Sequence, residues 1–185
     1  MINKKKNVFM KLYIILICLI HEIYSIEISV KSEKNISDVI DDLNSLLFNQ
    51  DINEIKLFFD DDNYKISSSS RNVIDVSKNI YFYSKNGTVF DFQNNFKNQI
   101  FFIYKPGVTD IKIVFKNITF YNFTYRSYKE FLMMFHISNS DNNFQIEFDN
   151  CTFMDIYSLL FYIQHSCYES TTSLPQTIFN NCKFM

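Results

Sequence analysis

Three copies of one short pattern decide the fold: Phe115–Phe120 (FKNITF), Phe148–Phe153 (FDNCTF) and Phe179–Phe184 (FNNCKF). Each copy holds Phe, Asn and Phe at the same offsets, and a weaker copy (KNIYF) occupies residues 78–82. Counted from Asn79, the Asn positions follow at steps of 38, 33 and 31 residues. A period of this length indicates stacked supersecondary units.

Short apolar runs fill the repeats. We expect strands at residues 55–59, 73–76, 80–83, 89–92, 100–104, 111–115, 131–137, 146–148, 159–163 and 178–179. About three strands and no helical pattern in each step predict an all-β chain of about four stacked parallel coils. A β-sandwich or barrel is the rival arrangement of the same strands.

The polar turn between the two Phe residues of each copy recurs along such a stack. Parallel strands lie about 4.8 Å apart, so equivalent side chains come within hydrogen-bonding distance of one another. We therefore expect Asn79, Asn117, Asn150 and Asn181 to point inward and to bond amide to amide in a ladder. An inward Asn whose amide is paired in this way costs little.

One helix precedes the strands, over residues 37–48. Ser37 is a suitable N-cap, and the acidic residues that follow favour the positive end of the helix dipole. Apolar residues share one face of this helix: Val39, Ile40, Leu43, Leu46 and Leu47.

The F-x-N-[IC]-x-F copies, this helix and the run 55–66 (IKLFFDDDNYKI) together resemble right-handed parallel β-helix proteins of the pectin-lyase-like superfamily. The resemblance covers residues 36–185 and implies that the helix plugs the N-terminal end of the core. No closing coil follows before Met185, so we expect an uncapped C-terminal end. The chain is then a fragment, a truncated product, or a module whose open end binds carbohydrate or another protein.

The first 25 residues have the layout of a secretory signal peptide. A basic stretch leads into the apolar run 12–20, polar residues follow, and Ser25 suits a cleavage site. We expect a secreted, extracellular domain over residues 26–185 with no membrane span, the alternative being an uncleaved anchor. The net charge of −2 is interspersed, which argues against a nucleic-acid partner.

Removal of the signal peptide takes Cys18 and leaves three cysteines. Cys151 and Cys182 share a repeat position with Ile118, so we expect buried, stacked thiols there. Cys167, in a Ser/Thr-rich loop, is the better candidate for a reactive thiol. No pair has zinc-site spacing.

The resemblance implies two kinds of catalytic site: Ca²⁺ with an Arg or Lys base, as in the lyases, or clustered Asp residues, as in the hydrolases. The candidates are Asp75, Asp91, Glu147, Asp149, Asp155, Arg71 and Arg126, and none matches a family motif. Glu147 and Asp149 should point outward together, on a solvated face or around a cation. We interpret Asp60–Asp62 as a solvated turn, His136 as outward-facing and His165 as the start of a loop. We assign no catalytic residue, metal site or cofactor.

Two surface features remain. N-glycosylation sequons occur at Asn35, Asn86, Asn117, Asn122 and Asn150, and an inward ladder would bar Asn117 and Asn150 from carrying a glycan. A set of tyrosines, suited to stacking on sugar rings, surrounds the loops of the last coils: Tyr121, Tyr125, Tyr128, Tyr157, Tyr162 and Tyr168. We expect a non-catalytic protein that binds carbohydrate or protein surfaces in adhesion or assembly. The alternative is the N-terminal part of a polysaccharide lyase or glycoside hydrolase.

Overall fold

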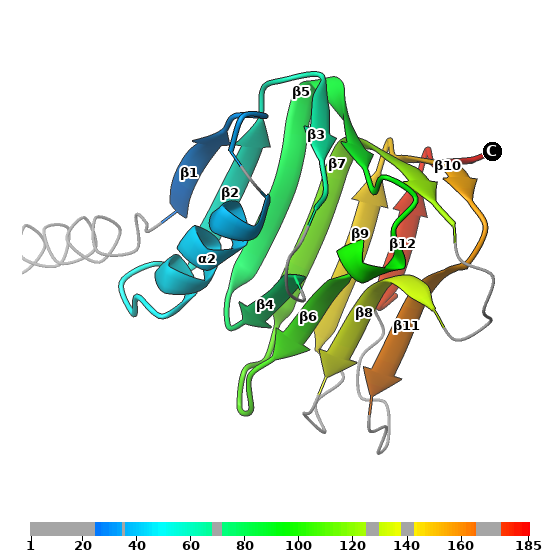
Figure 1. Cartoon of the computed structure of the whole chain (residues 1–185). Coiled ribbons are helices and arrows are strands. Elements are labelled where there is room, and N and C mark those ends of the chain that lie inside the picture. The colour runs from blue at the N-terminus through cyan, green and yellow to red at the C-terminus, as the bar shows by residue number, and fades with distance from the viewer. Residues whose placement is uncertain (1–24, 35, 68–71, 125–129, 138–142, 166–174) are drawn as a thin grey trace, which may run out of the picture.

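The computed structural model describes residues 25–34, 36–67, 72–124, 130–137, 143–165 and 175–185. They form a parallel β-solenoid of about five turns with one helix near the N-terminus (Figure 1). The predicted parallel β-helix is confirmed. The turn count exceeds the expected four because β1 (Ser25–Val30), which we did not predict as a strand, pairs with β2 (Glu54–Phe59).

The strands form two sheets, and within each sheet every pair of neighbouring strands is parallel. Sheet A contains β1, β2, β3 (Asn63–Lys65), β5 (Asn79–Asp91), β7 (Ile111–Phe123), β9 (Phe144–Asp149), β10 (Thr152–Ile156), β12 (Thr177–Asn180) and β13 (Lys183–Phe184). Sheet B contains β4 (Asn72–Val76), β6 (Ile100–Tyr104), β8 (Phe131–Ile137) and β11 (Leu159–His165), and a short 3-10 turn, η1 (Phe96–Asn98), precedes β6. The rival sandwich or barrel arrangement is wrong, because like residues of successive coils pair side by side.

Stacked rings fill the core of the solenoid. The Phe115 and Phe148 centroids lie 4.9 Å apart with an interplanar angle of 7°, and the next step, Phe148 to Phe179, is 5.2 Å at 10°. A second column runs from Phe120 through Phe153, at 5.0 Å and 10°. Such pairs contribute about 0.5–1.5 kcal/mol beyond their buried area. The repeat thus fixes the register between coils.

The Asn of each strong repeat is a one-residue corner. Asn117, Asn150 and Asn181 have φ values of 57°, 53° and 53°, in the left-handed region that Asn tolerates better than most residues. This conformation interrupts the strand alternation, so positions 1, 4 and 6 of the repeat face inward. Asn117 is half-buried, and Asn150 and Asn181 are exposed. The predicted inward orientation of the ladder is therefore wrong.

Asn79, the first of the four predicted ladder residues, does not belong to the ladder. It pairs in register with Glu54, and its Oδ1 accepts a hydrogen bond of 2.8 Å from the Lys112 backbone N–H. The corner of that coil lies between Tyr83 and Thr88, where the β5–β7 register shifts and Gly87 has a φ of 95°. A wider loop there replaces the single Asn.

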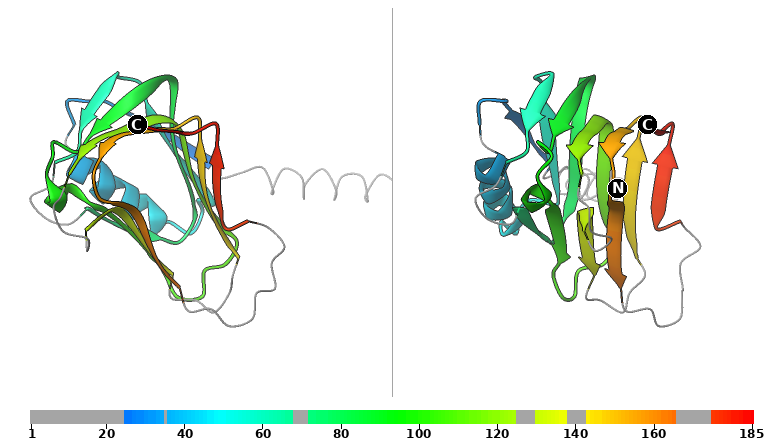
Figure 2. Two further views of the ribbon diagram at one scale, coloured as in Figure 1. Left: turned by 90° about the vertical axis from the view of Figure 1, so that its right-hand side faces the viewer. Right: turned by 45° about the vertical axis from the view of Figure 1, so that its right-hand side comes forward.

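Helix α2 (Ile36–Leu47) closes the N-terminal end of the core (Figure 2). It begins one residue earlier than predicted, so Ser37 lies in its first turn and is not the N-cap. Val39, Ile40, Leu43 and Leu47 are buried and Leu46 is half-buried, as its apolar face predicts. Within the described ranges, no helix has the length and apolar character needed to cross a membrane.

Asn44 of α2 blocks the edge of sheet B. Its Nδ2 donates to the Val73 carbonyl oxygen at 2.8 Å, and its Oδ1 accepts from the Asp75 backbone N–H at 3.0 Å. One side chain thereby pairs two backbone groups that a preceding strand would otherwise bond. The residue was missed from the sequence because nothing local distinguishes it from other Asn residues.

Candidate functional site

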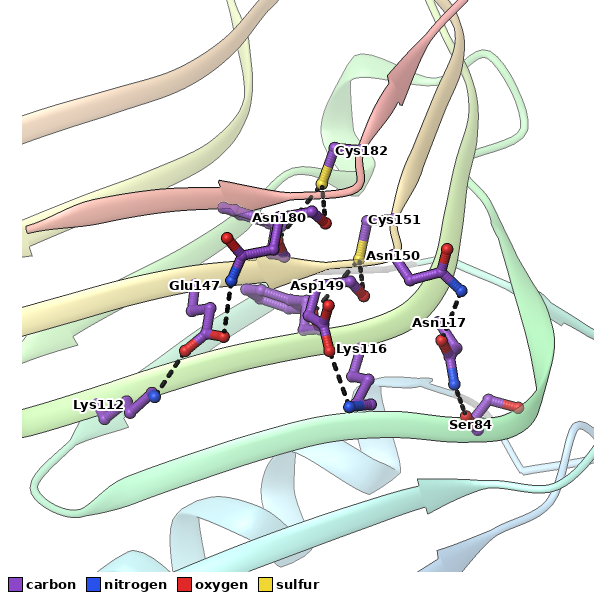
Figure 3. Close-up of polar contacts among 12 residues, drawn as sticks. Ser84, Lys112, Lys116, Asn117, Glu147, Asp149, Asn150, Cys151, Asn180 and Cys182 are labelled. Carbon is purple, nitrogen blue, oxygen red and sulfur yellow. Dashed lines mark hydrogen bonds and ion pairs between the residues drawn. The ribbon is translucent and has the colours of Figure 1, made fainter. Parts of the chain in front are cut away.

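The outward corner of sheet A carries an asparagine ladder (Figure 3). Asn150 Nδ2 donates to Asn117 Oδ1 at 2.8 Å, and Asn117 Nδ2 donates to the Ser84 carbonyl oxygen at 2.8 Å. The predicted amide-to-amide contact is confirmed for this pair, on the outer surface. Ladder Asn residues line a groove with Asn86 and with two lysines, Lys85 and Lys183.

The outward orientation changes the expectation for the sequons. Asn117 and Asn150 are not barred from the surface, so our reason for excluding them as glycan acceptors is wrong. Asn86 is exposed and Asn122 is half-buried, whereas Asn35 lies outside the described residues.

Carboxylates on the outer face of sheet A pair with lysines (Figure 3). Lys112 Nζ lies 2.6 Å from Glu147 Oε2, and Lys116 Nζ lies 2.8 Å from Asp149 Oδ2. Asn180 Nδ2 adds a contact of 3.3 Å to Glu147 Oε1. Glu147 and Asp149 point outward as predicted, and the lysines neutralise the charge that a cation would need. These pairs are partly exposed, so each contributes little stability.

The other catalytic candidates do not gather. Asp91 Oδ1 accepts from the Gln93 backbone N–H at 2.8 Å, and Asp155 occupies a second corner with a φ of 54°. Asp75 lies in β4 of sheet B, while Arg71 and Arg126 lie outside the described residues. Among the described residues, no three His, Cys, Asp or Glu side chains come together as a metal site would require.

The Asp60–Asp62 segment is a turn between β2 and β3, as interpreted from the sequence. Asp60 Oδ2 lies 2.7 Å from Lys31 Nζ, and Asp61 Oδ2 accepts from the Ser32 backbone N–H at 2.6 Å. That backbone hydrogen bond is the leading reason why the pKa of Asp61 is lowered. The turn therefore ties down the segment after β1.

The thiols of Cys151 and Cys182 stack on adjacent coils without a disulfide. Cys151 Sγ lies 3.4 Å from the Phe115 carbonyl oxygen, and Cys182 Sγ lies 3.3 Å from that of Phe148. Burial raises the pKa of Cys151 to about 12, and the pKa of the half-buried Cys182 is raised for the same reason. Both thiols are therefore protonated at neutral pH, and Cys151 is the less accessible of the two. Cys167 lies outside the described residues.

The outer face of sheet B carries a row of apolar side chains that we name the sheet B stripe: Val73, Phe101, Phe131, Met134 and Tyr162. The strand register places Phe101 beside Met134, and Met134 beside Tyr162. Phe131 stacks on Tyr162 at 5.6 Å and 20°, and its ring lies 5.9 Å from that of Phe101. The register also places Val73 beside Phe101, so the stripe is continuous across the four strands β4, β6, β8 and β11, and Tyr162 is 45% exposed.

Polar side chains lie two residues further along the same strands. His136 Nδ1 and Gln164 Oε1 are 3.1 Å apart on the outer face, so His136 points outward as predicted. His165 instead lies against Phe144, with centroids 5.4 Å apart. The stripe is thus bordered by planar polar groups that can donate and accept hydrogen bonds.

The predicted tyrosine set is only partly brought together. Tyr162 belongs to the stripe, Tyr121 lies half-buried in sheet A, and Tyr157 is exposed between β10 and β11. Tyr125, Tyr128 and Tyr168 lie outside the described residues. Phe101 and Phe131 were missed, because only the register between coils places them beside Tyr162.

Comparisons with protein-family models, curated proteins and solved structures found no match to the chain.

Proposed function

We propose that the chain is a secreted, non-catalytic β-solenoid that binds carbohydrate through the sheet B stripe. The observation that carries the proposal is the aromatic surface of Phe101, Phe131 and Tyr162 beside His136 and Gln164. A ring face offers the flat apolar surface against which the C–H face of a sugar packs. The bordering imidazole and amide match sugar hydroxyl groups, which both donate and accept hydrogen bonds.

The distribution of charge favours an uncharged glycan. The four strands of sheet B contain one Lys, Arg, Asp or Glu residue, Asp75 in β4, whereas the ion pairs found among the described residues involve α2, sheet A or the turns next to them. A face with a single carboxylate offers little attraction to charged polymers and imposes little cost of stripping solvent from charges. We therefore assign neutral polysaccharide as the ligand class.

Secretion is supported by the basic and apolar layout of the first 25 residues. The test is the intact mass of the protein released by its native cell, before and after deglycosylation and reduction. We expect the mass of residues 26–185, with a glycan increment that deglycosylation removes. A product retained in the cell would contradict the proposed location.

Binding is tested by co-sedimentation of the protein with insoluble neutral polysaccharides, with a carboxylated polysaccharide for comparison. Replacing Tyr162 by Ala should weaken binding by up to about 10-fold, the upper end for an aromatic contact. Tyr157→Ala is the matched control, because this exposed ring lies outside the stripe. Equal binding by both variants would contradict the stripe as the site.

Two other outcomes identify the alternatives. Release of soluble sugar fragments would favour the polysaccharide lyase or glycoside hydrolase, which rests on resemblance of fold, a weak guide to activity. Capture of proteins with no affinity for any glycan would favour a protein surface as the ligand.

A further inference from the structure

The groove at the outward corner of sheet A, which we name the corner groove, is lined by two rows of polar side chains. The rows run along the solenoid with one residue of each row per coil: Asn117, Asn150 and Asn181 in the first, and Thr119, Thr152 and Lys183 in the second. Neighbouring members of a row are one strand spacing apart, about 4.8 Å. They lie on the outer face, so an adjoining coil lies beside them and does not cover them. The groove therefore presents similar polar groups repeatedly along its length.

The charge on the corner groove is positive. Lys85 and Lys183 are both exposed, and no carboxylate among the described residues lies within ion-pair distance of either. Lys116, by contrast, is paired with Asp149 just before the corner. No Asp or Glu is found among the described residues that line the groove. A groove lined by one sign of charge concentrates ligands of the opposite sign.

The uncharged residues of the groove supply further hydrogen-bond donors. The hydroxyl groups of Thr119 and Thr152 have no hydrogen-bond partner among the described residues, and neither does the exposed amide of Asn181. Asn150 Nδ2 uses one of its two hydrogens on Asn117 Oδ1, which leaves the other for a ligand (Figure 3). Ammonium, hydroxyl and amide donors thus face the same groove.

These donors match a sulfate ester better than a carboxylate. The planar fork of arginine is the side chain that matches a carboxylate with two parallel hydrogen bonds, whereas lysine acts as a point charge. Among its described lining residues, the groove has two lysines and no arginine. A sulfate ester presents three terminal oxygens in three directions, which the three kinds of donor can approach together.

The dimensions of the groove indicate a polymer. Lys85 lies one coil before Asn117 and Lys183 lies two coils after it. The backbones of the two lysines are therefore about 14 Å apart, three strand spacings of about 4.8 Å. The groove volume of about 270 Å³ is below the range of pockets that enclose whole small ligands, about 300–1,000 Å³. An open groove of this size holds a stretch of a longer ligand.

We propose that the corner groove binds a sulfated polysaccharide whose chain follows the axis of the solenoid. Lys85 and Lys183 pair with its sulfate groups, and the hydroxyl groups of Thr119 and Thr152 donate hydrogen bonds to sulfate oxygens between them. This site lies on sheet A, apart from the sheet B stripe, and its ligand is charged where that of the stripe is neutral. It does not rest on the proposed function.

The test compares three forms of one glucan: dextran sulfate, carboxymethyl dextran and unmodified dextran. Each is labelled with fluorescein, and its binding to the full chain is followed by fluorescence anisotropy at about 0.15 M salt. We expect dextran sulfate to bind most tightly. Equal affinity for carboxymethyl dextran would contradict the assignment of sulfate, and equal affinity for unmodified dextran would contradict a charged ligand.

Lysine variants test the two ends of the groove. Lys85→Gln and Lys183→Gln should each weaken dextran sulfate binding by up to about 5-fold, and together by up to about 25-fold, the upper end for exposed ion pairs. Lys97→Gln is the matched control, because this exposed lysine of η1 also lacks an ion pair among the described residues and lies outside the groove. It should change binding by less than about 2-fold, since salt screens distant charges. Equal weakening by Lys97→Gln and Lys183→Gln would overturn the proposal.

A threonine variant separates the site from general attraction between charges. Thr119→Val with Thr152→Val keeps the charge and nearly the shape of the groove but removes both hydroxyl groups. We expect dextran sulfate to bind roughly 5-fold more weakly or less tightly still. Unchanged binding would mean that the charges alone attract the polymer, and the built site would be wrong.

Two further results would overturn the proposal: a glycan on Asn117 or Asn150 of the secreted protein, which would fill the groove, or single-stranded DNA bound as tightly as dextran sulfate. The two sites can fail separately. Tyr162→Ala should keep its affinity for dextran sulfate, and Lys183→Gln should keep its affinity for neutral polysaccharide.

Discussion

The two ends of the solenoid differ in how far the core is covered. At the N-terminal end α2 covers the core, and Asn44 pairs with the backbone of β4. At the C-terminal end Phe179 is 41% exposed, although Phe148 in the preceding copy is fully buried. The repeat therefore determines which way a side chain faces, and only a neighbouring coil or cap determines whether it is buried.

The largest expected effect comes from opening the closed end. Leu43 is fully buried, so Leu43→Ala should cost about 2–5 kcal/mol of unfolding free energy. The matched change at the open end, Leu159→Ala, removes a half-exposed side chain and should cost less than about 1 kcal/mol. Urea unfolding measures both losses of unfolding free energy, and we expect the dependence of that free energy on urea concentration to be the same in the variants and the unaltered protein. Equal losses would show that α2 does not seal the core.

A smaller effect is expected from unblocking the edge of β4. Asn44→Ala leaves the Val73 carbonyl and the Asp75 N–H without their side-chain partner, at a cost of about 1–3 kcal/mol. Ser45→Ala on the exposed side of the same helix is the control and should change stability by less than about 0.5 kcal/mol. Hydrogen exchange at Asp75 should accelerate only in the first variant. Unchanged exchange there would argue against the blocking role of Asn44.

The smallest effect concerns the thiols, one coil apart. The pKa of buried Cys151 is raised to about 12 from an ordinary value of 9.0. Below pH 9 the thiol is protonated in both states and has no effect on the pH dependence. As the pH rises from 9 towards 12, only the unfolded state loses the proton, so stability falls. Cys151→Ile should show a shallower fall than the unaltered protein in urea unfolding across this range.

The difference between the two ends should also appear in the rates at which the two thiols react. Cys182 is half-buried at the open end, so a thiol reagent should modify it before Cys151, as peptide mass mapping can establish. Equal rates would indicate that the last coil opens readily.

Much of the fold could be predicted because the repeat is explicit. Phe115, Phe148 and Phe179 share an offset, and the parallel stack follows from it. The inward Asn was a wrong inference from strict alternation. The corrective signal is present in the sequence: Ile118 and Cys151 are apolar at the fourth position, which indicates that the corner shifts the alternation by one.

Other features could not be predicted because they depend on register between distant strands. The sheet B stripe joins Phe101, Phe131 and Tyr162, whose alignment depends on the lengths of the loops between coils. β1 is a different case, since SIEISV alternates as a half-buried strand does. We did not recognise this alternation because we assigned Ser25, the first residue of the strand, to the signal peptide.

The one-residue corner also determines which changes of chain length the solenoid can accept. Deleting Asn150 or inserting a residue beside it would exchange the inward and outward sets for the rest of β10, sending Phe153 to the surface. The corner of β5 has four residues between Tyr83 and Thr88 where β7 has one, and Phe82 and Phe90 on either side are still buried. A corner can therefore change in length where the added residues form a loop that restores the alternation of the strand.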